Sequence, residues 1–368
     1  MSFITREKNG SWRARYRDPD GRAHSKNFVR KGDAEKFLTT IEHSKLTGAY
    51  VDPVAGKITF REYAEQWRSI QIHRPSTTAQ VETNLRLHAL PHLGHRSIAT
   101  IRPTQIQGWV RGLESSLAPG TVGLVYGYVA TIFKAAVRDR LIASTPCIGI
   151  KLPKDEPRQI QPLKTEIVEK LIVAVPDRYR ALVVLGAGTG LRQGEAFGLT
   201  LDRIDFLRRT LRVDRQLVLM PGDGPFLGPP KTKDSHRTIP LPQVVIDALA
   251  DHLAKYPTTQ DGFVFTNDDG QPIRRTRFSV MWRKAVMNSG APSGTGYHAL
   301  RHYYASLLIR HGESVKVIQS RLGHHDATET LNTYAHLWPD SEDRTRAAID
   351  DILGSPASDT RQTANENQ

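Results

Sequence analysis

The first part of the chain alternates large apolar side chains with basic ones, which is the pattern of a β-strand. Ser11–Arg17 reads SWRARYR, Asp18–Gly21 has the composition of a tight turn, and Arg22–Val29 returns as a second strand. Successive side chains of a strand point to opposite faces. The apolar face carries Trp12, Ala14 and Tyr16, and the other face carries Arg13, Arg15 and Arg17. The sequence therefore predicts a hairpin with one arginine-rich face.

A helix is predicted directly after the hairpin. Asp33 is a helix-capping residue type, Phe37, Leu38 and Ile41 have helical spacing, and Gly48 ends the pattern. A small sheet with a helix behind it and arginines in front suits contact with DNA phosphates or a groove. We expect this contact from Arg13, Arg15, Arg17 and Lys26. A solvated strand face is the alternative that the pattern leaves open.

The next segment, about residues 58–143, has the period of helices throughout. Thr59 and Glu62 form a capping-box pattern, a second helix covers about residues 78–89, and Thr104 with Gln107 opens a third. A fourth helix follows Pro119. Its apolar positions, spaced three and four apart, are Val122, Val125, Val129, Ile132, Phe133 and Ala136. Most of these apolar residues are expected to form a core.

A proline-rich stretch separates this helical segment from the second half of the chain. Residues 146–162 contain four prolines, a density that breaks helices and sheets, so we expect an extended linker. Beyond it the pattern mixes the two element types. Helices are predicted at 165–176, 178–187, 243–254, 276–288, 297–310, 314–321 and 327–334, and strands near 211–219 and 236–241.

Composition adds a polyanionic partner to this picture. The 368 residues include 51 Lys and Arg against 38 Asp and Glu, a net charge of +13, and the length predicts two or three domains. A charge of this size favours nucleic acid as the partner. No apolar run approaches the roughly 20 residues of a membrane helix, and the N-terminus does not resemble a secretory signal. Cys147 is the only cysteine, which excludes an intramolecular disulfide and a thiolate zinc cluster.

Four short segments of the second half carry the candidate chemistry. They contain Arg192 and Glu195 in GTGLRQGE, Lys231 and Lys233 in PKTKDSHRTIP, His298, Arg301 and His302 in HALRH, and His324 in LGHH ten residues before Tyr334. Each has a plain explanation by itself. An Arg–Glu pair three apart is commonly a surface ion pair, and a lone tyrosine commonly packs in a core. His298 and His302 have metal-ligand spacing, but Arg301 between them would repel zinc. Lys231 lacks the glycine-rich loop of a phosphate-binding lysine.

Taken together, these segments indicate phosphoryl transfer without a metal. Two arginines, a lysine and two histidines are donors suited to the charge that builds on phosphoryl oxygens in the transition state. Tyr334 is then a candidate nucleophile. Its hydroxyl has an ordinary pKa of about 10, so it needs the cationic cluster, a base, or both. The sequence has no matching set of spaced carboxylates for two-metal chemistry.

The ordered set Arg192, Lys231, His298, Arg301, His324 and Tyr334 resembles the tyrosine recombinase, or phage integrase, family, and the match covers essentially the whole chain. Ala196 and Ala299 depart from residues common in the family, but neither carries the chemistry. The resemblance implies a multidomain fold, mainly α with small β-sheets. It comprises an N-terminal three-stranded sheet plus helix (1–57), a helical, SAM-like core-binding domain (58–145), a linker (146–162), a mixed α+β catalytic domain (163–353) and a disordered tail (354–368).

The resemblance also implies a role for each residue. Tyr334 attacks the scissile phosphate to form a 3′-phosphotyrosyl link, Arg192, Arg301 and His324 bind the non-bridging oxygens, and Lys231 protonates the departing 5′ oxygen. His298 assists proton transfer at the tyrosine, and Glu195 supports the site. Lys233 remains open as the general acid, although Lys231 matches the family's context better. The link conserves the energy of the phosphodiester, so neither a metal nor a nucleotide cofactor is expected.

The implied function is that of a site-specific DNA integrase of a phage or an integrative element in the bacterial cytoplasm. Its expected partners are double-stranded DNA at core and arm attachment sites, further copies in a homotetramer, a host DNA-bending protein and an excision directionality factor, with no membrane. The helix expected at 341–353 would dock on a neighbouring copy or fold back on its own domain. A type IB topoisomerase and a DNA-binding regulator on an inactive scaffold are the alternatives. The sequence does not give the attachment sites.

Overall fold

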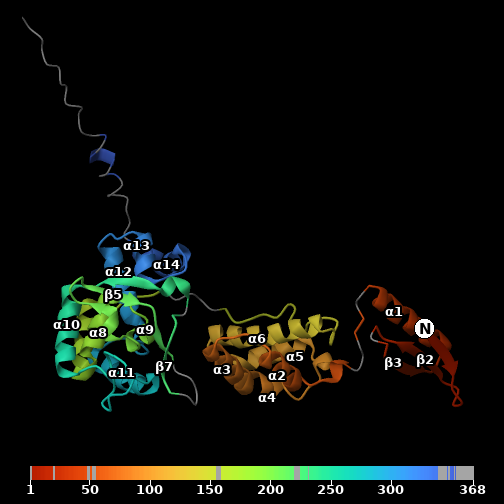
Figure 1. The fold of residues 1–368 in the computed structure, drawn as a ribbon. Helices are drawn as coiled ribbons and strands as arrows, with labels where there is room; N and C mark the ends of the chain where they lie inside the picture. The colour runs from red at the N-terminus through yellow and green to blue at the C-terminus, as the bar shows by residue number, and fades with distance from the viewer. Residues whose placement is uncertain are drawn as a thin grey trace, which may run out of the picture. The chain divides into compact units, whose positions relative to one another are not determined.

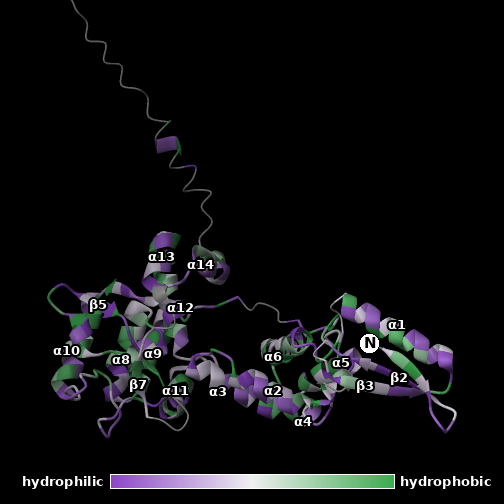
Figure 2. Ribbon diagram, turned by 45° about the vertical axis from the view of Figure 1, so that its right-hand side comes forward, coloured by the Kyte–Doolittle hydropathy of each residue, from purple (hydrophilic) through white to green (hydrophobic). Residues whose placement is uncertain are grey.

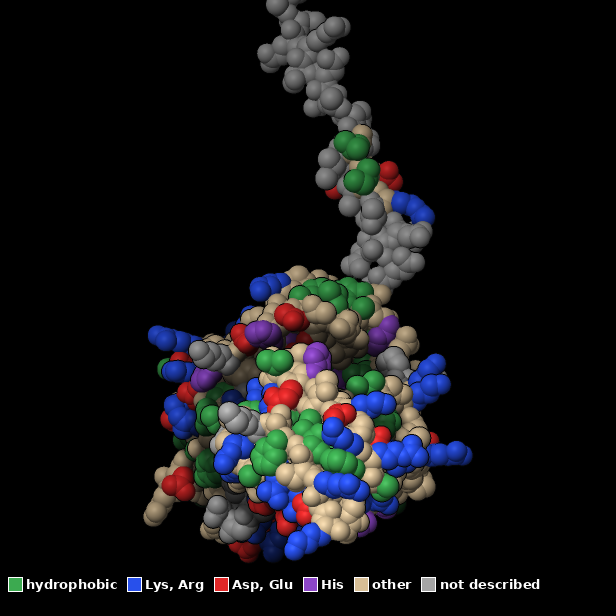
Figure 3. Space-filling view, turned by 90° about the vertical axis from the view of Figure 1, so that its right-hand side faces the viewer, with side chains coloured by type: hydrophobic (Ala, Val, Ile, Leu, Met, Phe, Trp, Pro, Cys, Tyr) green, Lys and Arg blue, Asp and Glu red, His purple; other side chains and the backbone are tan. Residues whose placement is uncertain are grey.

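The computed structural model describes residues 2–19, 21–47, 50–51, 55–154, 159–218, 224–230 and 232–338, and five positions between 346 and 353. It divides into two compact units, residues 1–157 and 158–368 (Figure 1). The predicted helix at 341–353 lies largely outside the described residues, and the predicted tail at 354–368 lies wholly outside them. Lys and Arg side chains are spread over the face shown in Figure 3, with Asp and Glu between them.

The N-terminal elements form a three-stranded antiparallel sheet covered by one helix. The strands β1 (Phe3–Arg6), β2 (Trp12–Arg17) and β3 (Ala23–Phe28) lie in that order, and the helix is α1 (Lys31–Leu46). Ala14 and Tyr16 of β2 are buried with Leu38 of α1, which confirms the predicted apolar face. Hydrophilic and hydrophobic residues alternate along α1 in Figure 2, as expected for a helix with one side on a sheet.

Two predictions for this region need correction or addition. The predicted cap at Asp33 is wrong, because α1 begins two residues earlier and Asp33 lies in its first turn, where a carboxylate is favourable near the positive end of the helix. Strand β1 was absent from the residue pattern, although the family resemblance implied a third strand. It pairs with β2 through partners such as Thr5 and Arg13.

The central elements are all helical. They are α2 (Phe60–Ser69), α3 (Pro75–Asn84), a π-helical turn (Leu85–Ala89), α4 (Leu90–Leu93), α5 (Pro103–Leu113) and α6 (Pro119–Arg138). The capping box of Thr59 and Glu62 is confirmed at the start of α2. The prediction that Thr104 with Gln107 opens the third helix is wrong by one residue, because α5 begins at Pro103. The side chain of Gln105 accepts from the backbone N–H of Arg102 at this end.

Helix α6 is the one described helix that is long and apolar enough to cross a membrane by length and composition, which the sequence analysis did not anticipate. Its apolar residues have another partner. Val122, Val125, Val129, Ile132 and Phe133 are fully buried in the core of the central helices, where the ring of Phe133 stacks on that of Phe60. We therefore interpret α6 as a core helix.

In the second unit, helices and small sheets surround a large core. Its helices are α7 (Thr165–Ala174), α8 (Asp177–Thr189), α9 (Gln193–Phe197), α10 (Gln243–Lys255), α11 (Arg275–Ser289), α12 (His298–Arg310), α13 (Val315–Leu322) and α14 (Ala327–Tyr334). One antiparallel sheet has the order β4 (Ile204–Asp205), β5 (Thr210–Val213), β8 (Arg237–Pro240), and β6 (Gln216–Val218) pairs with β7 (Phe226–Gly228). Helix α8 packs against α7, α10 and α12 at the centre.

The last three helices build a second, smaller core beside the main one. Tyr304 and Ile309 of α12, Ile318 and Leu322 of α13, and Tyr334 of α14 are buried together. Helices α13 and α14 have local capping signals. Ser314 and Asp326 cap α13 and α14 through their side chains, and Gly323 ends α13 in the left-handed conformation with φ of +64°. These signals place His324 and Tyr334 at fixed points next to α12.

Candidate active site

The ends of α8 and α13 and the starts of α9 and α12 bring most of the predicted site residues together. Arg192 lies at the start of α9, Arg301 lies on the first turns of α12, and His324 directly follows α13. The two arginines bind consecutive carbonyl oxygens at the end of α13. Arg301 Nη2 donates to the oxygen of Leu322 at 2.7 Å, and Arg192 Nη2 donates to that of Gly323 at 3.0 Å. Residues separated by more than a hundred positions thus meet at one helix end.

Glu195 is buried rather than part of a surface ion pair. Its residue is 4% exposed, one carboxylate oxygen accepts from Arg192 Nη1 at 3.0 Å, and the other accepts from the Arg192 backbone N–H at 2.9 Å. Burial by itself would raise the pKa of Glu195, but the hydrogen bonds and charges of Arg237 and Arg192 lower it below its usual value. A charged Glu195 therefore fixes the orientation of Arg192.

Arg301 is among the most buried side chains of the described chain, at 2% exposed. Besides Leu322 it binds the backbone oxygen of Gly190 through Nη1 at 2.9 Å. Burial and the neighbouring guanidinium groups of Arg192 and Arg237 lower its pKa to about 9, which still leaves Arg301 positively charged at neutral pH. The site therefore contains at least two fixed positive charges.

The histidines of the site are neutral at pH 7. Burial and the nearby arginines lower the pKa of His298 to about 4 and that of His324 to about 3. His324 is 7% exposed and shares a hydrogen bond of 2.8 Å with Thr330, whereas His298 remains in contact with solvent. A neutral imidazole can accept a proton at one nitrogen and donate from the other.

Tyr334 is fully buried, and its hydroxyl contacts a histidine that the sequence analysis did not assign to the site. A hydrogen bond of 2.8 Å joins the Tyr334 hydroxyl and Nδ1 of His302. His302 lies one helical turn after His298 on α12, and the two rings meet edge to face at 4.7 Å. Burial raises the pKa of Tyr334 to about 12, although Arg301 opposes this, and burial lowers that of His302 to about 4.

The predicted lysine is the one catalytic candidate that cannot be placed. Lys231 and the side chain of Lys233 lie outside the described residues. The turn that carries them is nevertheless tied to the site. Ser235 is fully buried, its hydroxyl accepts from Arg192 Nη1 at 3.2 Å, and it lies 2.9 Å from the hydroxyl of Thr232.

Two residues of this site were missed by the sequence analysis, and both had a signal. His302 shares a helix face with His298, because residues four apart on a helix lie one above the other. Arg237 is on β8, where alternation places it on the same face as the buried Ile239. Its guanidinium binds both oxygens of Glu195, at 3.1 and 2.8 Å.

The predicted DNA-binding residues of the N-terminal sheet divide between its two faces. Arg13 and Arg15 pair with Thr5 and Phe3 of β1 and lie on the face away from α1, as does Arg17. Lys26 pairs with Ala14 and so lies on the helix side, with its ammonium 5.1 Å from the ring centroid of Phe37. Three of the four predicted residues therefore share a face.

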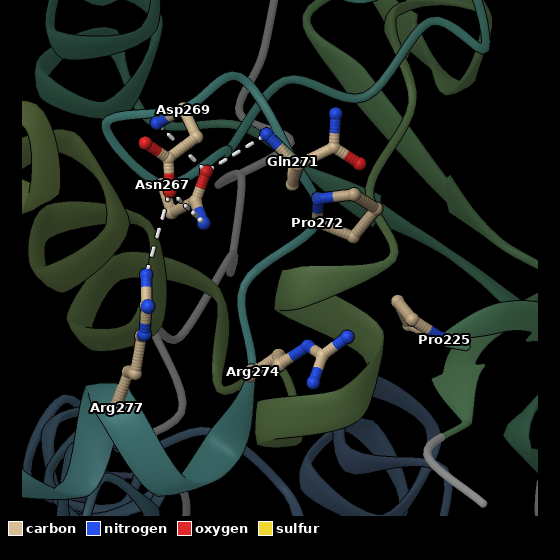
Figure 4. A pocket seen from close by; sticks show the side chains of 7 residues that line it. All are labelled: Pro225, Asn267, Asp269, Gln271, Pro272, Arg274 and Arg277. Atoms are coloured by element: carbon tan, nitrogen blue, oxygen red, sulfur yellow. Dashed lines mark hydrogen bonds and ion pairs between the residues drawn. The ribbon is translucent and has the colours of Figure 1, made fainter. Parts of the chain in front are cut away.

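A cavity of about 320 Å³ lies elsewhere in the second unit (Figure 4). The described residues that line it are Pro225, Asn267, Asp269, Gln271, Pro272, Arg274 and Arg277. Arg277 Nη1 donates to Asp269 at 3.4 Å. The predicted catalytic residues are not part of this lining, so the cavity is separate from the candidate site.

Comparison with known proteins identifies the family of all three parts of the chain. Residues 161–340 match the phage integrase family, residues 3–48 match the phage integrase N-terminal domain, and residues 60–151 match the phage integrase central domain. A XerC-like tyrosine recombinase of Caldanaerobacter subterraneus is 28% identical over 92% of this chain and 94% of its own. The integrase of Mycobacterium phage D29 is 26% identical over 86% of this chain and 88% of its own.

Solved structures agree with these matches. The Tn1549 transposon integrase in complex with a circular intermediate DNA has a TM-score of 0.69 at 25% identity, over 80% of this chain and 99% of the other. A lambda integrase tetramer bound to a Holliday junction shares the fold, with a TM-score of 0.60 at 16% identity, over 89% of this chain and 96% of the other. The chain therefore belongs to the phage integrase family of tyrosine recombinases, and it is a site-specific DNA recombinase.

Proposed function

We propose that Tyr334 is the nucleophile of strand cleavage and that Arg192, Arg301 and His324 bind the non-bridging oxygens of the scissile phosphate. The observation that carries this proposal is the convergence of these four residues on the short segment from the end of α13 to the end of α14. Fixed positive groups stabilise the charge that builds on phosphoryl oxygens, and they need no reorganisation during the reaction. Glu195 supports the site by fixing Arg192.

The cleavage step conserves atoms and charge within the site and the DNA. The Tyr334 oxygen forms a bond to phosphorus while the bond from phosphorus to the 5′ oxygen breaks, leaving a 3′-phosphotyrosyl link. The phenol proton passes to His298, whose neutral state makes it an acceptor. Lys231 donates a proton to the departing 5′ oxygen. Rejoining reverses these transfers, so the energy of the phosphodiester is conserved.

Tyr334 has to move before it can react. A fully buried hydroxyl bonded to His302 cannot contact a phosphate on DNA. His298 lies one turn away from His302 on the same face of α12, about 6 Å along the helix axis. The charges of both Arg301 and Arg192 lower the pKa of His298. We propose that binding of DNA brings the phenol from His302 to His298.

The other parts of the chain would direct this chemistry to its sites. We assign residues 1–57 to arm-site binding, with Arg13, Arg15 and Arg17 as the contacting face and Lys26 as a lesser contributor. Residues 58–145 would bind the core site, and residues 146–162 would link them to the catalytic domain. Residues 163–353 would catalyse strand cleavage and rejoining. Four copies would assemble on two duplexes, as the lambda integrase tetramer does on its Holliday junction. The proposed further partners are a host DNA-bending protein and an excision directionality factor. The proposed location is the bacterial cytoplasm. The topoisomerase and inactive-regulator alternatives are not favoured by relatives that are recombinases and integrases.

The test is to trap and map the covalent complex. On a nicked duplex that loses its 5′ fragment after cleavage, the wild-type protein should accumulate a protein–DNA adduct, and peptide mapping should locate the modification at Tyr334. Tyr334→Phe should bind DNA with unchanged affinity and form no adduct, because it lacks only the attacking oxygen. Adducts that survive in Tyr334→Phe, or that map to another residue, would exclude Tyr334 as the nucleophile.

A further inference from the structure

Three guanidinium groups bind three consecutive carbonyl oxygens at the end of α13, and one of them has no assigned role. Arg301 binds the oxygen of Leu322 and Arg192 binds that of Gly323, as described above. Arg237 Nε donates to the oxygen of Arg321 at 2.8 Å. The last carbonyls of a helix lack partners within the helix and carry its negative end. Arg237 therefore belongs to the same cluster as the two predicted phosphate ligands.

Arg237 cannot itself be a ligand for DNA in this arrangement. Its side chain is 4% exposed and Arg301 is 2% exposed, so burial does not distinguish the two arginines. The difference lies in their donors, because the described hydrogen bonds of Arg301 use two of its five N–H groups. Arg237 Nη1 donates to Glu195 Oε1 at 3.1 Å and to the oxygen of Ser235 at 2.9 Å, and its Nη2 donates to Glu195 Oε2 at 2.8 Å. With the bond to Arg321, four of its five N–H donors have partners inside the protein. A role in catalysis would have to act through the residues that it holds.

Those residues are the ones that orient the site. Both oxygens of Glu195 are bound by Arg237, and the same two oxygens hold the side chain and the backbone N–H of Arg192. A rotation of Glu195 would therefore move Arg192. Planar, bidentate contact of this kind is specific to arginine, since a lysine ammonium is a point charge without the fork.

The second connection runs to His324. Gly323, which precedes it, packs so closely on Arg237 that an added Cβ would lie 3.2 Å from both Cδ and Nη1 of Arg237. The bond from Arg237 Nε to Arg321 fixes the same turn from the other side. The path of the chain into His324 therefore depends on where the Arg237 side chain lies.

We propose that Arg237 is a positioning residue for strand cleavage, which fixes Arg192 through Glu195 and His324 through the end of α13. This proposal rests on the proposed roles of Arg192 and His324 as phosphate ligands. The competing explanation is that the Arg237–Glu195 pair serves folding alone. A buried ion pair is weak evidence for stability, because the cost of removing both charges from water offsets their attraction.

The experiment compares Arg237→Lys with the wild type in covalent adduct formation on the nicked duplex. With DNA at saturation, we expect the rate constant of cleavage to fall by about tenfold to a hundredfold, the loss expected from misplacing groups by about 1 Å. DNA affinity, measured by fluorescence anisotropy, should be unchanged, since Arg237 does not reach the surface. Cleavage at the wild-type rate, or a loss explained by weaker DNA binding, would overturn the proposal.

A matched control is available in the same sheet region. Arg203 Nε binds both oxygens of Asp214, at 3.0 and 2.9 Å, with the arginine side chain 21% exposed and no contact to the site residues among its described partners. Arg203→Lys should cleave at the wild-type rate. If both lysine variants slow cleavage equally, then losing any arginine–carboxylate pair slows cleavage. In that case the assignment of Arg237 as a positioning residue fails.

If Arg237→Lys is unstable, a double replacement distinguishes slow cleavage caused by lost positioning from slow cleavage caused by poor folding. Replacing Arg237 and Glu195 together by Met exchanges a buried ion pair for apolar groups, a change that is often neutral or stabilising. A folded double variant, verified by calorimetry, should still be slow in cleavage with normal DNA affinity, and normal cleavage by it would refute the proposal. The wild type and Tyr334→Phe are assayed alongside these variants. If the wild type itself forms no adduct, the result counts against the proposed function and not against the role of Arg237.

Discussion

Tyr334 is kept as a neutral phenol by its surroundings. Its side chain packs with Tyr304, Ile318 and Leu322, and its hydroxyl is bound to His302. With the pKa of Tyr334 raised to about 12 by burial and that of His302 lowered to about 4, neither group changes charge in the neutral range. In this buried position the hydrogen bond to His302 therefore holds Tyr334 as a neutral phenol.

Replacing His302 should show how much its hydrogen bond to Tyr334 stabilises the fold. In His302→Ala the buried hydroxyl loses its partner, and the free energy of unfolding should fall by about 1–3 kcal/mol in urea denaturation. Adding Tyr334→Phe to this variant gives a double-mutant cycle, in which we expect a coupling of about 1 kcal/mol. The coupling should be equal at pH 6 and pH 9, because neither group titrates between them in the folded protein and the titration of the unfolded chain cancels in the cycle. A coupling of zero, or one that changes over this range, would contradict the hydrogen bond.

The lowered pKa values of His302 and His324 make the fold sensitive to acid. In both, the pKa of the folded state lies below the ordinary value of about 6.5, so the unfolded chain binds protons more readily. Their contribution to stability is complete above about pH 6.5 and is lost as the pH falls toward 4 for His302 and toward 3 for His324. Each should add up to about 1.4 kcal/mol per pH unit to the slope of the free energy of unfolding. His324→Gln should make this slope shallower in urea denaturation, and an unchanged slope would argue against a buried neutral His324.

At the scale of elements, the end of α13 is the point where the site is assembled. The last two residues of α13 and its C-cap residue Gly323 present three carbonyl groups to three arginines, and His324 directly follows. The hydrophobic period predicted this helix at 314–321 and the structure has it at Val315–Leu322. The period alone could not show which groups would satisfy its last carbonyls, because those partners come from β8, α9 and α12.

Two helix-ending glycines allow this geometry to be tested. Gly290 ends α11 with φ of +73° and open space around it, so Gly290→Ala should cost only the backbone strain, about 1–2 kcal/mol. At Gly323 an added Cβ would also lie 3.0 Å from the oxygen of Asp234 and 3.2 Å from Arg237. Gly323→Ala should therefore destabilise more in calorimetry and should slow adduct formation, whereas Gly290→Ala should leave it unchanged. Equal effects of the two variants would mean that the close packing at Gly323 is unimportant.

At the scale of the whole molecule, the positive charge is not confined to the part that carries the catalytic candidates. The net charge of +13 includes an arginine-rich face on a sheet that has no catalytic residue. On this face Arg13 is partly engaged by Glu7 at 3.1 Å and by Asn27 at 3.0 Å, and Arg15 lies over the ring of Phe3. These contacts hold the long side chains in an extended sheet surface, which suits binding along a DNA backbone or groove.

The salt dependence of DNA affinity measures how much this arginine-rich face contributes to DNA binding. For a duplex of random sequence, replacing Arg13, Arg15 and Arg17 together by Ala should lower the slope of log affinity against log salt by about 0.9 for each lost phosphate contact, up to about 2.7. Replacing Arg86, Arg180 and Lys255 by Ala removes the same charge from positions paired with acidic residues and should change the slope less. Fluorescence anisotropy over a series of salt concentrations gives both slopes. Equal slopes for the two variants would remove the sheet from the DNA-binding surface.

The sequence by itself determined most of the helices, the N-terminal hairpin and the chemical inventory of this protein. Helix periods, the Thr59 capping box and strand alternation are local properties. The order of Arg192, Lys231, His298, Arg301, His324 and Tyr334 was sufficient to indicate the family. Only the tertiary structure decided that Glu195 is buried, that Arg237 holds it, and that Tyr334 rests on His302. Those contacts join positions up to 42 residues apart along the chain. Their strength comes from the exclusion of water around them, and no local pattern records which distant segment excludes it.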